Sequence, residues 1–176
     1  MKKLLLALAT ITCVTSPIKA GVGTIEDHKY LISALETVGV TVKVNENCSQ
    51  GYMGYYTIDT NIIQICQQNR HPIFEKEVEW TEEDYDTLRH EAHHALQDCV
   101  AGTIDDNMMG YYFADDKEFK EYIATALTER EINIIITTYT EFGATEEVLK
   151  RELEAFAVAK TTNARTIGET IIKLCQ

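Results

Sequence analysis

The sequence predicts an α+β fold, in which a small N-terminal sheet is followed by a mostly helical C-terminal part. Runs with the composition and alternation of strands lie between residues 40 and 66, whereas the patterns after residue 80 have the spacing of helices. The chain has no internal repeat and no linker rich in proline or serine, so residues 21–176 fit a single domain. Strands first and helices later are the order of an α+β domain.

The expected elements follow from local patterns. Strand patterns occupy three stretches: 40–44, 52–58 and 61–66. Helical patterns outside the central helix occupy four stretches: 26–38, 116–138, 145–162 and 167–174. The first of these helices ends at Gly39, and the last two strands are joined near Asp59 and Thr60.

The central helix is predicted by signals at both of its ends. Thr81 is a good N-cap, an acidic residue stands three positions later, and three carboxylates fall in the first turn, where the helix dipole favours negative charge. No glycine or proline follows until Gly102, which is a suitable end. A helix of about five turns results.

This helix carries the sequence His90-Glu91-Ala92-His93-His94, which fits the pattern H-E-x-x-H. In a helix, His90 and His94 are one turn apart and can bind one Zn²⁺, while Glu91 stands beside the open coordination position. Both histidines lie off the apolar stripe of the helix, which argues against ordinary core packing. His93 points away from the pair and is expected at the surface or in a supporting position.

A catalytic zinc needs a third protein ligand, and the sequence indicates a carboxylate. No histidine follows His94, so the ligand is expected to be an acidic residue on an apolar helix face. Glu152 lies near the middle of the apolar face predicted for 145–162, whereas Glu154 points to the opposite side. A carboxylate in an apolar surrounding is costly unless it is paired or bound to a metal. The alternative to zinc is an ion pair between Glu152 and a buried arginine such as Arg130.

These two segments resemble the gluzincins, zincin metallopeptidases that carry H-E-x-x-H on one helix and a glutamate ligand on a later one. The stretch Glu152-Leu153-Glu154-Ala155 is similar to the Glu-x-x-Ala of the family's ligand helix. The resemblance implies a minimal zincin-like domain with zinc bound by His90, His94 and Glu152, and with Glu91 as the general base.

One position departs from the family pattern. Members with Glu-x-x-Ala often continue with an aspartate that supports a zinc-bound histidine, and Phe156 stands here instead. The supporting partner is then expected to come from elsewhere, with Gln97 and Asp98 as candidates, or to be missing. Glu154 remains the alternative third ligand.

The function that follows is hydrolysis of peptide bonds in a peptide or protein substrate. A zinc-activated water would attack the scissile carbonyl while Glu91 takes its proton. Tyr111, Tyr112 or His71 could stabilise the developing oxyanion. Residues 62–65 could form an edge strand that pairs with extended substrate, although a plain core strand is equally consistent with them. Two other classes stay open: a zincin-like binding module without turnover, and a disulfide-stabilised interaction protein without metal.

The N-terminus has the three regions of a secretory signal peptide. Lys2 and Lys3 precede an apolar run from Leu4 to Val14, and a short polar region ends at Ala20. The apolar run is too short to span a bilayer comfortably, and a retained anchor is the alternative. We expect cleavage after residue 20 and a secreted or periplasmic protein, with no integral membrane segment in the mature chain.

Removal of residues 1–20 leaves an even number of cysteines, as is usual in an exported protein. The remaining four are Cys48, Cys66, Cys99 and Cys175. Three pairings are possible, and the predicted layout favours Cys48 with Cys66 and Cys99 with Cys175.

The chain is strongly acidic. Its formal net charge is −12, and loss of the three lysines in residues 1–20 would leave 13 basic and 28 acidic residues, a net charge of −15. This charge disfavours binding to nucleic acid or to anionic membranes and favours cationic or neutral substrates. The acidic stretch 105–107 lacks the ligand spacing of an EF-hand and is expected to be a solvated loop.

Overall fold

The computed structural model describes residues 21–46, 48, 51–70, 77–104 and 108–176. Within these residues the strands are β1 (Thr41–Val44), β2 (Gly54–Thr57) and β3 (Ile62–Ile65). The helices are α1 (Ile25–Thr37), α2 (Glu82–Ala101), α3 (Asp116–Ala126), α4 (Glu129–Glu141), α5 (Glu146–Thr161) and α6 (Ala164–Leu174). The predicted α+β fold is therefore confirmed. The predicted signal peptide, His71 and the acidic stretch 105–107 lie outside the described residues.

The three strands form one sheet in the order β1-β3-β2. β2 and β3 are an antiparallel hairpin, as expected, while β1 pairs with β3 in parallel. The possible role of 62–65 as an edge strand is therefore wrong, because β3 is central, and its apolar run is typical of a strand buried on both faces. β2 is an edge strand instead. It lies so close to α2 that a Cβ on Gly54 would come within 2.5 Å of Thr87 Cγ2.

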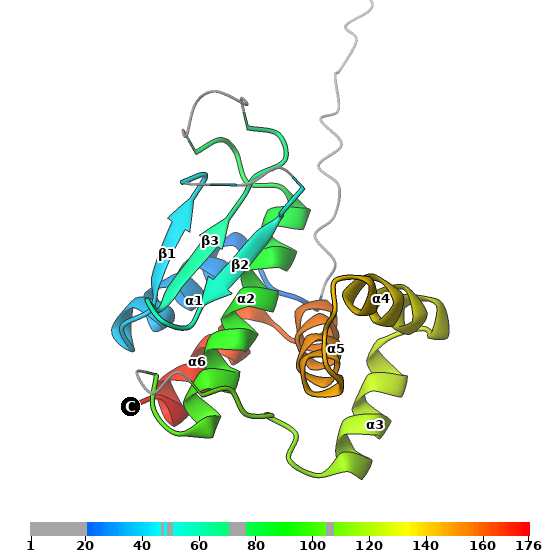
Figure 1. Cartoon of the computed structure of the whole chain (residues 1–176). Coiled ribbons are helices and arrows are strands. Elements are labelled where there is room, and N and C mark those ends of the chain that lie inside the picture. The colour runs from blue at the N-terminus through cyan, green and yellow to red at the C-terminus, as the bar shows by residue number, and fades with distance from the viewer. Residues whose placement is uncertain (1–20, 47, 49–50, 71–76, 105–107) are drawn as a thin grey trace, which may run out of the picture.

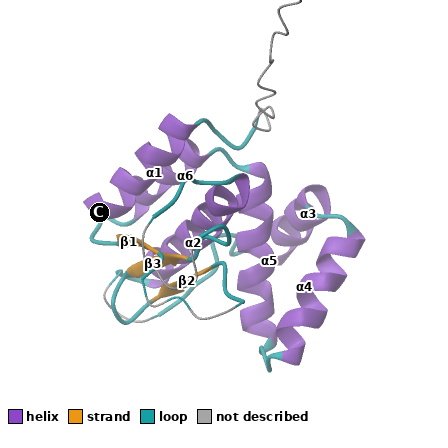
Figure 2. Cartoon of the chain, turned by 90° about the horizontal axis from the view of Figure 1, so that it is seen from above, coloured by secondary structure: helices purple, strands orange, loops and turns teal. Residues whose placement is uncertain are grey.

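The long helix α2 lies between the sheet and α5 (Figures 1 and 2). Its ends are those predicted: the Thr81 hydroxyl and the Asp84 carboxylate form a capping box, and Gly102 is the C-cap. α1 and α6 lie side by side, and α3 and α4 pack on the far side of α5. The main core joins the sheet to α1, α2 and α6 through side chains such as Leu31, Leu35, Ile63, Ile65, Leu88 and Ile171. This arrangement encloses the middle of α2 on several sides.

The helix predicted at 116–138 is in fact two helices. Leu127 leaves the helical conformation at the end of α3, and Thr128 begins α4 as its N-cap. Thr128 and Glu131 form a capping box, which supplies hydrogen bonds to the new helix end and makes the break favourable. The break allows α4 to pack on α5, where Tyr139 lies next to Phe156 and Glu152.

Both predicted disulfides are confirmed. Cys48 is bonded to Cys66 beside the sheet, and Cys99 at the end of α2 is bonded to Cys175 after α6. Two disulfides fit an extracellular protein, because such bonds persist in oxidising surroundings. Among the described helices, none is both long and apolar enough to cross a membrane.

Candidate metal centre

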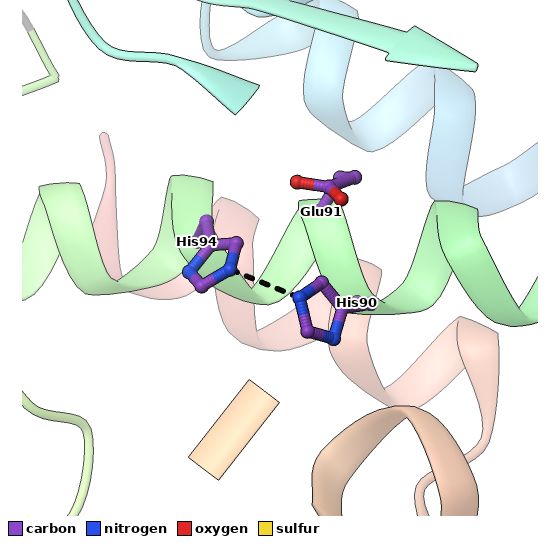
Figure 3. Close-up of side chains that lie close together, drawn as sticks. All are labelled: His90, Glu91 and His94. Atoms are coloured by element: carbon purple, nitrogen blue, oxygen red, sulfur yellow. Dashed lines mark hydrogen bonds between the residues drawn. The ribbon is translucent and has the colours of Figure 1, made fainter. Parts of the chain in front are cut away.

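Three side chains of the central helix come together on α2. His90, Glu91 and His94 each offer one ligand atom, and these atoms all lie within 4.8 Å of one another. Figure 3 shows the two imidazoles next to each other along α2, with Glu91 on the side that faces the sheet. All three side chains are buried, although each is polar. A buried polar cluster of this kind needs partners of its own.

Glu152 on α5 completes the cluster from the other side. Its Oε2 lies 3.3 Å from His90 Nε2, and its Oε1 lies 3.5 Å from His94 Nε2. The two Nε2 atoms are 3.1 Å apart. Ligands about 2.0–2.1 Å from one tetrahedral zinc would be separated from each other by about 3.4 Å. Each imidazole nitrogen therefore lies about as far from the other nitrogen, and from one Glu152 oxygen, as two ligands of the same metal ion do.

The donor set also fits a metal by its chemistry. Glu152 Oε2 is buried and has no well-oriented hydrogen-bond partner in the described part of the chain. Two imidazole nitrogens and a carboxylate are ligands that zinc prefers. A cation bound between them would compensate for burial of the carboxylate. His90, His94 and Glu152 could thus hold a metal ion.

Strong coupling within the cluster appears in the pKa values of its members. Burial alone would raise the pKa of Glu152, but the two imidazoles hold it far below its usual range. Burial alone would lower the pKa of His94, yet the Glu152 carboxylate raises it to about 9. The carboxylate is therefore ionised and favours a positive charge beside it.

Glu91 occupies a different environment from the three candidate ligands. Burial raises the pKa of its carboxyl group, and the nearby His90 and His94 only partly offset this effect. The backbone N–H of Tyr56 in the edge strand β2 donates to the carboxylate. The sheet thus positions Glu91 beside the histidines, on a different side of α2 from α5.

The orientation of His94 is set by Gln97. Gln97 Oε1 lies 2.8 Å from His94 Nδ1 and accepts a hydrogen bond from it, so that Nε2 faces His90 and Glu152. Gln97 was one of the two supporting residues predicted. The other, Asp98, accepts a hydrogen bond from the Tyr56 hydroxyl at 2.6 Å.

The prediction for Glu154 was wrong about exposure: it was expected opposite the apolar face of its helix but is fully buried. His93, expected at the surface or in a supporting position, is buried with it, so the surface alternative is wrong. Glu154 Oε2 accepts hydrogen bonds from His93 Nε2 at 3.1 Å, Gln97 Nε2 at 2.6 Å and the backbone N–H of Tyr112 at 3.1 Å. Its Oε1 accepts from the backbone N–H of Phe113 at 2.8 Å. Glu154 therefore anchors the segment after α2, and Glu152 is the carboxylate that faces His90 and His94.

Two further side chains at the centre were not foreseen. The hydroxyl of Tyr139 on α4 faces Glu152, and burial together with this carboxylate raises the pKa of Tyr139 well above its usual value. The ring of Phe156 contacts the ring of His90, with centroids 4.4 Å apart. Of the predicted oxyanion residues, Tyr111 contacts Lys150 instead, and Tyr112 uses its backbone to bind Glu154.

Glu152 is also not paired with an arginine. Its partners in the described part of the chain are the two imidazoles and Tyr139, so the predicted alternative of an ion pair with Arg130 is not observed. Comparison of the chain with protein-family models, with curated proteins and with solved structures finds no match. The functional interpretation therefore rests on the residues and geometry described above.

Proposed function

We propose that this protein is an exported zinc-dependent metallopeptidase of the gluzincin type, with His90, His94 and Glu152 as ligands and Glu91 as the general base. The observation that carries the proposal is the convergence of three side chains: the Nε2 atoms of His90 and His94 are 3.1 Å apart, and Glu152 Oε2 and Oε1 lie 3.3 and 3.5 Å from the first and the second of them, respectively. The position of Glu91, within 4.8 Å of both histidines, agrees with the role of a base beside the metal.

Zinc bound at this centre would supply a Lewis acid that polarises a peptide carbonyl and lowers the pKa of water to about 7. The Glu91 carboxylate then accepts a proton from the attacking water and delivers it to the leaving amine. The raised pKa of Glu91 suits a group that must both accept and release a proton. We assign donation to the developing oxyanion to the Tyr139 hydroxyl; its contact with Glu152 supports this role.

The edge strand β2 is our candidate for binding extended substrate. It lies against α2 at Gly54, and its Tyr56 N–H contacts Glu91. A peptide that adds to this edge would place its backbone next to the general base. The sequence had indicated residues 62–65, now β3, for this pairing with substrate, and we assign it to β2 instead. The two disulfides agree with export to the cell exterior or periplasm.

The direct test is hydrolysis of a mixed peptide library by the zinc-loaded protein, with products identified by mass spectrometry. Glu91→Gln keeps the shape of the side chain and should retain zinc, yet it should lose roughly 10²-fold or more in rate. Glu169→Gln, which removes an exposed carboxylate from α6, is the matched control and should cleave normally. Hydrolysis that survives both Glu91→Gln and a zinc chelator would contradict the proposed mechanism. Peptide binding by the zinc-loaded wild type without any hydrolysis would contradict the peptidase function and favour a binding module.

A further inference from the structure

A cavity of about 540 Å³ opens beside the candidate metal centre, between the first turns of α2, the helix α4 and the second half of α5. Its apolar wall is formed by Val22, Leu127, Ile134, Ile135 and Phe156. Cavities of this size are typical of binding sites for small groups. The volume is large enough to admit a long side chain, and the wall is suited to its aliphatic stem.

The cavity is adjacent to the candidate metal centre along both helices. On α2, Asp86 in the cavity lies one turn before His90, and on α5, Phe156 lies one turn after Glu152. One turn corresponds to a step of about 6 Å along each helix. The ring of Phe156 forms part of the cavity wall and also contacts the ring of His90. The cavity is therefore the next space along the molecule from the candidate ligands.

Charged side chains surround the cavity, and negative charge is in excess. Four carboxylates and two cations line it: Glu82, Glu83, Asp86 and Glu131, with Arg89 and Lys160. The net charge of these six groups is −2. A cationic ligand is thus favoured by the cavity as a whole.

Both cations are already engaged. Arg89 is buried and donates to Asp86 at 2.9 Å, to the carbonyl oxygen of Ala159 at 2.8 Å and to His28 Nε2 at 2.5 Å. Lys160 donates to both carboxylate oxygens of Glu131 at 2.7 Å. Asp86 and Glu131 are thus already paired with cations. The carboxylates whose charge can still bind a cationic ligand are the two in the first turn of α2 that line the cavity, Glu82 and Glu83.

Glu82 and Glu83 supply that charge. Both are exposed, and neither forms a salt bridge within the ranges that the structure describes. Carboxylates in a first turn also stabilise a helix by their interaction with its dipole. A test of Glu82 and Glu83 therefore needs a control helix whose first turn carries the same two carboxylates. The first turn of α5 offers this comparison, because Glu146 and Glu147 stand there in the same arrangement.

We propose that this cavity is a specificity pocket for a lysine or arginine side chain of the peptide substrate. The aliphatic stem packs on the apolar wall, and the cationic end lies at Glu82 and Glu83. The inference rests on the proposed peptidase function, because it identifies the residue that this same site selects.

Binding can be measured separately from hydrolysis. The probes are fluorescently labelled hexapeptide pools that differ only in one fixed residue: arginine, lysine, norleucine or glutamate. Zinc-loaded Glu91→Gln protein is titrated with each pool, and the anisotropy gives the ratio of affinities. We expect a preference of about fivefold for arginine or lysine over norleucine, the size expected of two solvent-exposed charge contacts.

The double variant Glu82→Gln with Glu83→Gln should reduce this ratio to about one, while Glu146→Gln with Glu147→Gln should leave it unchanged. Thermal melts of both variants show whether the helices are intact. A ratio near one in the parent protein, or a ratio that persists without Glu82 and Glu83, would overturn the pocket. Selective binding without any hydrolysis by the wild-type protein would instead overturn the peptidase function and leave the pocket standing. Hydrolysis by the wild type without any preference for arginine or lysine would overturn the pocket and leave the peptidase function standing.

Discussion

Replacement of Glu154 by glutamine should destabilise the protein more than the same replacement of Glu152. Glu154 is fully buried and accepts four hydrogen bonds, two of them from the backbone after α2. In Glu154→Gln an NH₂ group takes the place of one of the two carboxylate oxygens. The least disruptive orientation puts it at the position of Oε1, because Oε1 accepts only one hydrogen bond, from the Phe113 N–H, whereas Oε2 accepts three.

The magnitude follows from these contacts. The Phe113 N–H would lose its acceptor, which costs about 1–3 kcal/mol, and three charge-assisted hydrogen bonds to Oε2 would become ordinary ones. Lower desolvation of a neutral side chain offsets part of this loss. We expect a decrease of about 2–4 kcal/mol in the free energy of unfolding. For a domain of this size, that corresponds to a fall in Tm of about 6–12 °C.

The assay is urea denaturation followed by circular dichroism, with disulfides intact and with a chelator present so that zinc does not contribute. Glu152→Gln is the matched control on the same helix. Its Oε2 has no well-oriented partner among the described groups, and residues shaped for binding are commonly not optimal for stability. We expect Glu152→Gln to cost less than Glu154→Gln, because its contacts in the described part of the chain are with side chains and none is with a backbone N–H. An effect of Glu154→Gln below about 0.5 kcal/mol, or equal effects of the two changes, would refute the structural role of Glu154.

Three further predictions concern other parts of the molecule. Replacement of both Cys99 and Cys175 by serine should decrease the free energy of unfolding, measured with urea, by about 4 kcal/mol, because this disulfide closes a long loop with a sequence separation of 76. The same change at Cys48 and Cys66, with a separation of 18, should cost less, and a larger cost there would contradict the argument. Burial lowers the pKa of His28, whose Nε2 accepts a hydrogen bond from Arg89. Below about pH 6.5 the unfolded chain therefore binds a proton at this histidine more readily than the folded chain does, and the free energy of unfolding should decrease as the pH falls. His28→Gln should abolish this part of the pH dependence. Alanine at Gly54 should decrease the melting temperature, because its Cβ would meet Thr87 Cγ2 at 2.5 Å, and an unchanged melt would show that β2 can move.

The parts of the site that could be predicted are those set by local geometry. The spacing of His90 and His94 depends only on a helix, and that helix has clear signals at Thr81 and Gly102. Glu152 was found because a carboxylate on an apolar helix face needs a partner. Each of these arguments uses one segment at a time, and the two segments then meet in the fold.

The features that were missed depend on contacts between distant segments. Glu154 is buried by backbone N–H groups of a loop without periodicity, and β3 is central only because β1 pairs with it on its other side. The break at Thr128 could have been found, since Thr128 and Glu131 have the spacing of a capping box. Without this break, Tyr139 could not be placed near Glu152. The cavity beside the centre was equally hidden, because three helices form it.

The most direct measurement is the metal content of the purified protein by mass spectrometry, for the wild type, Glu152→Gln and Glu154→Gln. Circular dichroism at low temperature confirms that each variant is folded. The account predicts one zinc per chain in the wild type and in Glu154→Gln, and a much weakened or absent zinc in Glu152→Gln. A folded wild type without stoichiometric metal, or a Glu152→Gln protein that binds zinc as tightly as the wild type, would contradict it.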